Sequence, residues 1–206
     1  MRVLHLGKLC PPNEGGIEVF TSDLLECLNL KSIEADLLCF GDKMEEGMYN
    51  GFKFYSCKID LKLSSALVSL DFVKHFKKLA NKYDLIHVHS PNPIAEMLSI
   101  FSPRPFVVHW HSDIVRQRIL YTFYKPFQQA YLKRAKRIIC TSPQYLESSN
   151  QVASYKEKAV VIPLGLNPRR LSCDENDEKF VEMKDKIKGK RVVLSIGRLI
   201  YYKGFE

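Results

Sequence analysis

Short, uninterrupted runs of apolar residues alternate along this chain with longer segments whose apolar residues recur at helical spacing. The runs expected to form strands are residues 3–6, 35–40, 52–57, 85–89, 106–110, 138–140 and 159–162. The segments expected to form helices are residues 17–31, 65–82, 94–101, the basic segment ending near Arg134, and a segment capped by Ser142. Strands that are apolar throughout are typical of a parallel sheet covered on both faces. The pattern therefore predicts an α/β fold with a doubly wound parallel sheet.

The character of the chain changes after residue 166. Residues 167–190 are polar and charged and are expected to form a connector with one helix. Residues 191–197 have the pattern of the first strand of a new α/β unit, but a lone strand cannot form a core. We expect an N-terminal domain over residues 1–166, a connector over 167–190, and the truncated start of a second domain over 191–206.

Length and composition exclude several classes of protein. The 206 residues are 46% hydrophobic, which is enough to bury a core, and no stretch approaches the roughly 20 apolar residues of a membrane span. The apolar start is too short for a secretory signal. The six cysteines include no C-x-x-C pair, which excludes a zinc ribbon or a thioredoxin motif. We expect a soluble, cytosol-facing chain whose cysteines are mostly reduced core residues.

Positive charge is concentrated in two segments. The net charge of the chain is +8, of which residues 112–137 carry +6 and residues 62–82 carry +4. Both segments are also rich in apolar and aromatic residues. They fit solvated helix faces whose other side is core, or amphipathic helices on an anionic bilayer. Nucleic acid is disfavoured as a partner because no RNP, KH, zinc-finger or helix-turn-helix motif accompanies the charge.

The loop after the first expected strand could approach an anion. Gly15 and Gly16 lie directly before the helix expected from Ile17, where backbone N–H groups and the helix dipole favour negative charge. The spacing matches neither G-x-G-x-x-G nor a Walker loop, which disfavours dinucleotide and P-loop sites. A plain tight turn is the alternative.

Two pairs of histidines occupy expected strands and their ends: His87 with His89, and His109 with His111. Residues two apart on a strand point to the same face. A metal site needs a third ligand, and Asp113 is the one acidic candidate nearby. The crevice at the carboxyl edge of a doubly wound sheet is the alternative setting, and His111 is best placed there to donate a hydrogen bond. Core or rim histidines without a function also fit.

Two cations, Arg198 and Lys203, follow the last expected strand. They are placed to neutralise a diphosphate, although two cations in a turn are also common on any protein surface.

Six motifs occur in an order typical of one enzyme family. They are Pro-Pro…Gly-Gly-Ile-Glu, Asp84…His87-Val88-His89, His111-Ser112-Asp113, Thr141-Ser142-Pro143, Ile162-Pro163-Leu164-Gly165 and Gly197-Arg198…Lys203-Gly204. In these motifs the chain resembles the GT-B glycosyltransferases of family 4, over essentially all of its length. The resemblance implies the N-terminal half of a GT-B fold, in which two Rossmann-like domains face each other across a cleft. The N-terminal domain mainly holds the acceptor and the C-terminal domain holds the nucleotide-sugar donor.

The resemblance also implies transfer with retention from a nucleotide sugar to a glycan or lipid-linked acceptor, without a metal or other cofactor. His111 matches the histidine near the transferred sugar and is the expected catalytic residue. The loop with Gly15 and Gly16 is expected to approach the diphosphate or the acceptor, and Arg198 and Lys203 to stabilise the leaving diphosphate. The residues expected to bind substrate or donor are Gly15, Gly16, His89, Asp113, Arg198 and Lys203.

The chain departs from the family in its length. A complete member is about twice as long, as two domains require, and the C-terminal acidic motif that grips the nucleotide is absent from these residues. We therefore expect little or no transferase activity from the 206 residues alone, with a second chain as one source of the donor half. The alternative to an enzyme is a non-catalytic acceptor- or partner-binding half of a split transferase.

Acceptors in the family are often lipid-linked sugars in the synthesis of lipopolysaccharide and other surface polysaccharides. The two basic segments would then dock on anionic lipid, which predicts a cytoplasmic protein peripheral to the inner face of the membrane. The residues expected at the membrane surface are Lys133, Arg134, Lys136 and Arg137.

Overall fold

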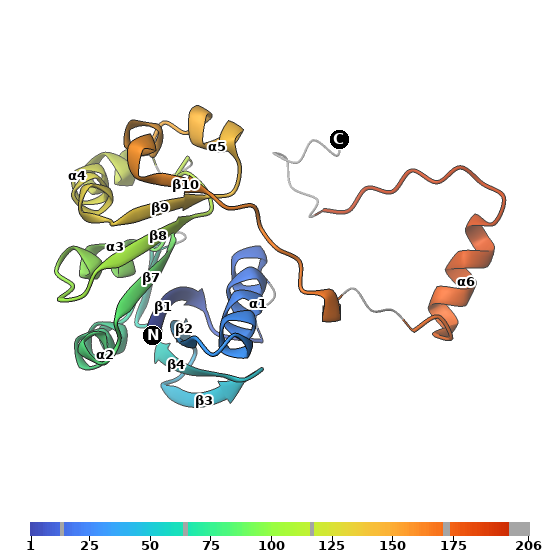
Figure 1. Ribbon diagram of the computed structural model, residues 1–206, viewed down its shortest axis with the longest axis horizontal. Coiled ribbons are helices and arrows are strands. Elements are labelled where there is room, and N and C mark those ends of the chain that lie inside the picture. The colour runs from blue at the N-terminus through green and yellow to red at the C-terminus, as the bar shows by residue number, and fades with distance from the viewer. Residues whose placement is uncertain (13–14, 64–65, 116–117, 171–173, 198–206) are drawn as a thin grey trace. The chain divides into compact units, whose positions relative to one another are not determined.

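The computed structural model describes residues 1–12, 15–63, 66–115, 118–170 and 174–197. The chain divides into two compact units, Met1–Leu166 and Asn167–Glu206, which we describe separately (Figure 1). In the second unit, the short 3-10 helix η3 (Pro168–Arg170) precedes helix α6 (Glu178–Ile187). The single helix expected between residues 167 and 190 is confirmed as α6, which Asp177 caps through bonds from the backbone N–H groups of Lys179 and Phe180.

The first unit is built on an eight-stranded sheet. Its strands are β1 (Arg2–Leu9), β2 (Glu34–Gly41), β3 (Glu45–Tyr49), β4 (Phe52–Lys58), β7 (Leu85–Ser90), β8 (Phe106–Trp110), β9 (Arg137–Cys140) and β10 (Ala159–Val161). The spatial order is β10-β9-β8-β7-β1-β2-β4-β3, and only the pair of β3 with β4 is antiparallel. The chain proceeds outward from β1 in both directions, as in doubly wound folds. The predicted fold class is confirmed.

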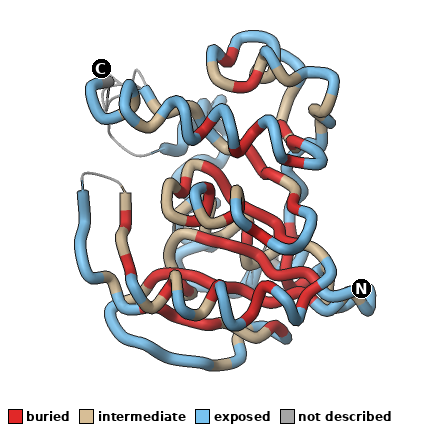
Figure 2. Tube along the Cα trace, turned by 90° about the vertical axis from the view of Figure 1, so that its left-hand side faces the viewer, coloured by how far each residue is buried: buried red, intermediate tan, exposed pale blue. Residues whose placement is uncertain are grey.

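Helices cover both faces of this sheet (Figure 1). Helix α1 (Gly16–Leu30) lies on one face, and α2 (Leu70–Leu79), α3 (Pro93–Ile100) and α4 (Arg118–Arg134) lie on the other. One hydrophobic cluster contains Leu25 of α1, and a larger one contains Phe72, Trp110 and Tyr131. Figure 2 shows that the buried residues follow the strands. The short α5 (Pro143–Ser148) begins where expected, because the Ser142 side chain accepts a bond from the backbone N–H of Tyr145.

The helix expected over residues 65–82 is wrong in its first part. Strands β5 (Leu61–Leu63) and β6 (Ala66–Val68) pair as antiparallel strands instead, and Leu67 is buried in the larger core. Helix α2 begins only after Ser69, whose hydroxyl accepts a bond from the backbone N–H of Phe72. An N-cap inside an apolar segment divides it into strand and helix, which periodicity alone did not reveal.

Two other strand assignments differ from expectation. Strand β3 was not expected. It pairs with β4 through a turn in which Asn50 and Gly51 both adopt positive φ, as a type I′ hairpin turn requires. The strand expected over residues 191–197 is not formed, and these residues are exposed. A strand needs a neighbour to satisfy its backbone, and the described part of the second unit supplies no strand to pair with it.

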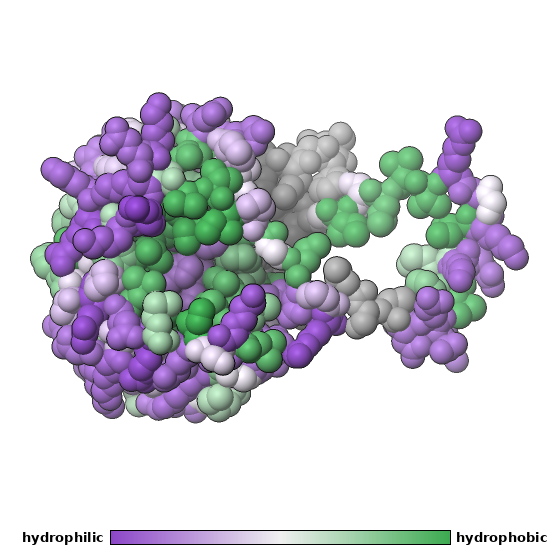
Figure 3. Space-filling view, viewed as in Figure 1, coloured by the Kyte–Doolittle hydropathy of each residue, from purple (hydrophilic) through white to green (hydrophobic). Residues whose placement is uncertain are grey.

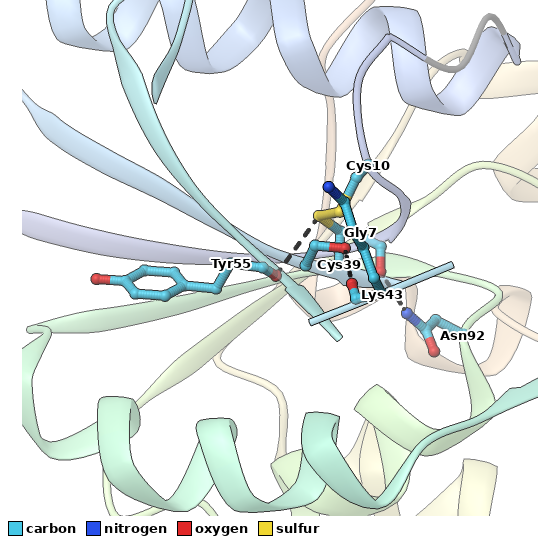
Figure 4. The surroundings of a disulfide bond; sticks show 7 residues. Gly7, Cys10, Cys39, Lys43, Tyr55 and Asn92 are labelled. Carbon is cyan, nitrogen blue, oxygen red and sulfur yellow. Dashed lines mark hydrogen bonds between the residues drawn. A yellow bond between two sulfur atoms is a disulfide. The ribbon is translucent and has the colours of Figure 1, made fainter. Parts of the chain in front are cut away.

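The cysteines fall into several classes. Cys57 and Cys140 are buried free thiols, as expected, whereas Cys27 is a free thiol on the surface. Cys10 and Cys39 form a disulfide between the end of β1 and β2, which the sequence reasoning did not anticipate (Figure 4). It ties the start of the loop that leads to α1 onto the sheet, beside the bond from the Asn92 side-chain amide to the Gly7 carbonyl.

None of the helices within the described ranges has the length and apolar character needed to span a bilayer. The face of the first unit seen in Figure 3 is hydrophilic around its rim and has an apolar area where β10 lies in Figure 1. Val160 of β10 and Ile162 and Leu164 beyond it are exposed.

Replacing Tyr83 with Phe should destabilise the first unit. The buried Tyr83 hydroxyl donates to Asp36 Oδ2 at 2.6 Å, and the backbone N–H of Lys53 donates to Oδ1. Removing the hydroxyl leaves a buried carboxylate oxygen without that donor, so urea denaturation should show a loss of about 1–3 kcal/mol. In the control Tyr155→Phe, the lost contact is a 3.4 Å bond at the surface, and the change should stay below about 0.5 kcal/mol. Equal losses would contradict the assignment.

Candidate active site

Five of the six histidines gather on the face of the sheet beneath α1. His5 pairs in register with His87 across β1 and β7, and His89 pairs with His109 across β7 and β8. Alternate residues share a face, so the register places these rings side by side. The ring of Phe20, on α1, lies 4.7 Å from that of His109. We call the following residues the histidine cluster: His5, His87, His89, His109 and His111.

Three of these imidazoles form a hydrogen-bonded chain. His5 Nδ1 lies 3.0 Å from His89 Nε2, and His89 Nδ1 lies 3.1 Å from His111 Nε2. In both pairs the ring centroids are farther apart than the nitrogens by about the diameter of one imidazole, so the bonds lie close to the ring planes. His87 stacks against His89 at 4.8 Å, and His109 stacks against His111 at 4.5 Å.

Burial keeps the whole cluster neutral. Burial lowers the pKa of His5 to about 3, with the nearby His109 adding to the effect, and lowers the pKa of His109 to about 4. Burial and the neighbouring His109 lower the pKa of His111 to about 3. The pKa values of His87 and His89 are lowered well below the usual range by the same burial and by the surrounding histidines. His111 is the one member of the cluster that reaches the surface.

Two groups of three histidines have the spacing of metal ligands: His5 with His87 and His89, and His89 with His109 and His111. Neither contains a carboxylate. Mg²⁺ and Mn²⁺, the ions suited to phosphate groups, prefer oxygen ligands. The donor set of the cluster therefore does not fit an ion that would hold a diphosphate.

The loop before α1 leads directly to the histidine cluster. Gly15 is the N-cap of α1, and Thr21, two turns along, lies 3.3 Å from His89 Nδ1. A Cβ on Gly16 would meet nothing within 4 Å, whereas one on Gly15 would collide with the flexible Glu18 carboxylate. Neither glycine is required by a positive φ. The open space at Gly16 is compatible with close approach of a ligand to the helix N-terminus.

Asp113 holds the segment that carries His111. Its Oδ1 accepts hydrogen bonds from Trp110 Nε1 at 2.9 Å and from the hydroxyls of Tyr145 and Ser149 at 2.7 Å each. The backbone N–H of His111 also donates to the Ser90 carbonyl. The expected role of Asp113 in binding substrate stays a prediction, and the contacts show it joining the end of β8 to the α5 region.

The structure brings the Gly15–Gly16 loop, His89, His111 and Asp113 to the carboxyl side of β7 and β8. Arg198 and Lys203 lie outside the described residues. The four cations expected at a membrane lie at the opposite edge, where α4 ends and β9 begins. The guanidinium of Arg134 donates there to the carbonyls of Ile100 and Ser102, and Arg137 Nη1 donates to the Lys136 carbonyl.

Sequence reasoning missed two members of this site, His5 and Thr21. His5 is a single histidine in an apolar run, and only the register of β1 against β7 brings it beside His87. Thr21 lies on the buried face of α1, where its position in the sequence indicates only a residue that packs in the core.

The cluster predicts that the protein loses stability in acid. Each folded-state pKa lies below its ordinary value of 6.5, so unfolding takes up protons below that pH. Stability is therefore fully present above pH 6.5 and falls as pH drops towards the folded-state values near 3 to 4, by up to about 1.4 kcal/mol per pH unit for each histidine. Urea midpoints between pH 7 and 4 measure this slope.

His109→Gln removes one titrating ring. The number of protons taken up on unfolding, which sets the slope of stability with pH, should therefore fall by about one. A urea midpoint that does not change between pH 6.5 and 4 would show that the cluster is protonated in the folded protein.

Comparisons with known proteins agree with this fold. Residues 14–170 match the model of Glycosyltransferase Family 4. The chain is 35% identical to O-antigen chain mannosyltransferase C of Escherichia coli and 31% identical to D-rhamnosyltransferase WbpZ of Pseudomonas aeruginosa. Both matches cover 100% of this chain but only 56% and 55% of the relatives, so the chain spans about half their length.

Solved structures share the fold at low identity. Anabaena Alr3699/HepE in complex with UDP and glucose superposes with a TM-score of 0.63 and 18% identity, over 91% of this chain and 50% of that one. A glycosyltransferase from Rickettsia africae gives a TM-score of 0.55 and 16% identity, over 90% and 49% of the two chains. From the family match and the two relatives, we conclude that the chain belongs to glycosyltransferase family 4.

Proposed function

We propose that this chain is the acceptor-side half of a retaining glycosyltransferase that moves a sugar from a nucleotide-sugar donor to a glycan or lipid-linked acceptor in the synthesis of a surface polysaccharide. The relatives, a mannosyltransferase of the O-antigen chain and a rhamnosyltransferase, support the reaction class. The solved neighbours with UDP and glucose support a nucleotide sugar as donor. The observation that carries the proposal is His111, which stands half-buried at the carboxyl edge of β8 on a chain of buried histidines.

The chemistry of such a transfer explains what these residues would do. Departure of a nucleoside diphosphate builds negative charge, which fixed donors offset best where water is excluded. The first N–H groups of α1, beside Gly15 and Gly16, suit an anionic oxygen or a sugar hydroxyl. A neutral His111 suits a sugar hydroxyl, since it carries one N–H donor and no charge. We assign the leaving diphosphate to Arg198 and Lys203, on the resemblance of their motif.

We also propose that the transfer needs no metal ion. The support is chemical: the two metal-spaced groups among the described residues consist of imidazoles alone, which do not suit a cation bridging phosphate oxygens. Cationic side chains, in place of a metal ion, would then stabilise the charge of the leaving diphosphate.

The transfer should require a donor-binding half in addition to these residues. The purified 206-residue chain should show little or no sugar transfer from nucleotide sugars of mannose or rhamnose, because these residues supply only part of the donor site. In a longer protein that includes a donor half, His111→Gln should lower kcat about 100-fold or more through loss of an interaction at the reacting sugar. His75→Gln is the matched control, since His75 lies on α2 away from the cluster.

Substantial transfer by the 206-residue chain, or full activity of the His111→Gln protein, would overturn this assignment. Saturable glycan binding without turnover in every longer form would favour the alternative, a non-catalytic half of a split transferase.

We further propose that the protein acts in the cytoplasm at the inner face of the membrane, with the first half of α4 against the lipid. Four apolar side chains there are exposed on one side of the helix: Ile119, Leu120, Phe123 and Phe127. The inward side of this half carries Tyr124, whose hydroxyl donates to the Glu96 carboxylate, and the buried Gln128. This half of α4 lies at the same edge of the sheet as His111, because α4 runs from the end of β8 to the start of β9.

Removing apolar side chains from this face should weaken membrane binding. Ile119→Ser combined with Phe123→Ser removes two large exposed groups, each worth about 1.5–3 kcal/mol when buried. Co-sedimentation with vesicles of phosphatidylglycerol and phosphatidylethanolamine should fall at least tenfold. Leu30→Ser on α1, an apolar position that is also largely exposed, is the control and should bind normally.

Neutralising Lys133, Lys136 and Arg137 tests the cationic contribution, and Arg134 is left intact because it holds the carbonyls of Ile100 and Ser102. Vesicle binding that neither set of changes reduces would refute the docking proposal.

A further inference from the structure

We infer that Thr21 is a positioning residue that, through His89, fixes which nitrogen of His111 carries the proton. Thr21 contacts no expected substrate position itself. Its effect passes along the hydrogen-bonded chain of His5, His89 and His111. The direction of the hydrogen bonds in that chain follows from the protons available at Thr21 and at His5.

Beside helix α1, the single hydroxyl proton of Thr21 is used in a hydrogen bond within the helix. Thr21 Oγ1 donates to the Ile17 carbonyl at 2.7 Å within α1. Oγ1 therefore meets His89 Nδ1, 3.3 Å away, as an acceptor, and His89 must carry its proton on Nδ1. The same N–H points at His111 Nε2, 3.1 Å away, in a three-centre bond. Two N–H groups cannot point at each other, so His111 Nε2 is unprotonated and accepts the bond.

At the inner end, the contacts favour the same direction. A neutral His89 with its proton on Nδ1 accepts at Nε2, so His5 donates from Nδ1 at 3.0 Å. His5 Nε2, which is buried without a hydrogen-bond partner, then carries a lone pair and no proton. The reverse direction would place an N–H at that buried atom. A buried donor without an acceptor is the rarer and costlier arrangement.

The consequence concerns His111, which is neutral and half-buried. With Nε2 accepting from His89, its single proton sits on Nδ1, so His111 presents that ring edge as a hydrogen-bond donor. The partner is an oxygen acceptor, a sugar hydroxyl or a diphosphate oxygen, and the ring cannot act there as a base. This last step rests on the proposed transferase function, whereas the proton positions do not.

Nitrogen NMR of the 206-residue chain tests the proton positions directly. Long-range proton–nitrogen correlation of ¹⁵N-histidine distinguishes protonated from bare ring nitrogens. His5, His89 and His111 should all show a protonated Nδ1 and a bare Nε2 at pH 7. A protonated Nε2 on His111 in the unaltered protein would overturn the inference, and that result needs no variant.

Thr21→Val removes the acceptor while keeping the branched shape, and Thr21→Ser retains the hydroxyl. In Thr21→Val, the His111 resonances should move towards a mixture of the two tautomers, and Thr21→Ser should restore the original pattern. Unchanged His111 resonances in folded Thr21→Val would show that Thr21 does not set the proton position.

Activity separates this inference from the proposed function. In a longer, active protein, Thr21→Val should lower kcat about 10- to 100-fold with little change in KM, as outer partners of reacting groups do, and Thr21→Ser should recover it. A tautomer change in Thr21→Val with full transferase activity would keep the proton assignment and refute the role of His111 in transfer.

Discussion

The parallel register of β1, β7 and β8 is the constraint on which the rest of the site depends. It sets His5 against His87 and His89 against His109, so that polar rings lie side by side on a face covered by a helix. Buried imidazoles without a counter-charge remain neutral, and neutral imidazoles can satisfy one another only as donor to acceptor. The register of the sheet thereby decides that these rings are neutral and that they bond to one another, whereas the direction of the bonds is set by Thr21 on α1.

Helix α1 links this constraint to the surface. Its N-terminus opens from the Gly15–Gly16 loop, and Thr21 on its inner side reaches the histidine chain at His89. Asp113 provides a second support by joining the segment beyond β8 to Tyr145 and Ser149. His111 is therefore held by its ring through the cluster and by its backbone through the loop, an arrangement that preorganises a hydrogen-bond donor.

Charge and apolar surface prove to be separated along α4. The segment reads in sequence as one basic, apolar stretch, but the exposed Phe123 lies near the carboxyl edge of the sheet and Lys136 near the amino edge. Arg134 is occupied with backbone carbonyls, so part of the positive charge serves to join α4 to the end of α3. In the proposed membrane docking, this separation gives the exposed apolar side chains a larger part than charge alone.

The sequence by itself determined the α/β class, the positions of most strands and helices, and the family, because these follow from apolar periodicity, caps and ordered motifs. It also indicated His111, since a polar residue directly after a buried strand stands at the carboxyl edge of a parallel sheet. Only the tertiary structure brought in His5 and Thr21, which are far from His89 along the chain and meet it through strand register and helix placement. Likewise, only the pairing of residues 61–63 with residues 66–68 replaced the first part of the expected helix. Local patterns specify elements, whereas contacts between distant residues depend on how those elements pack.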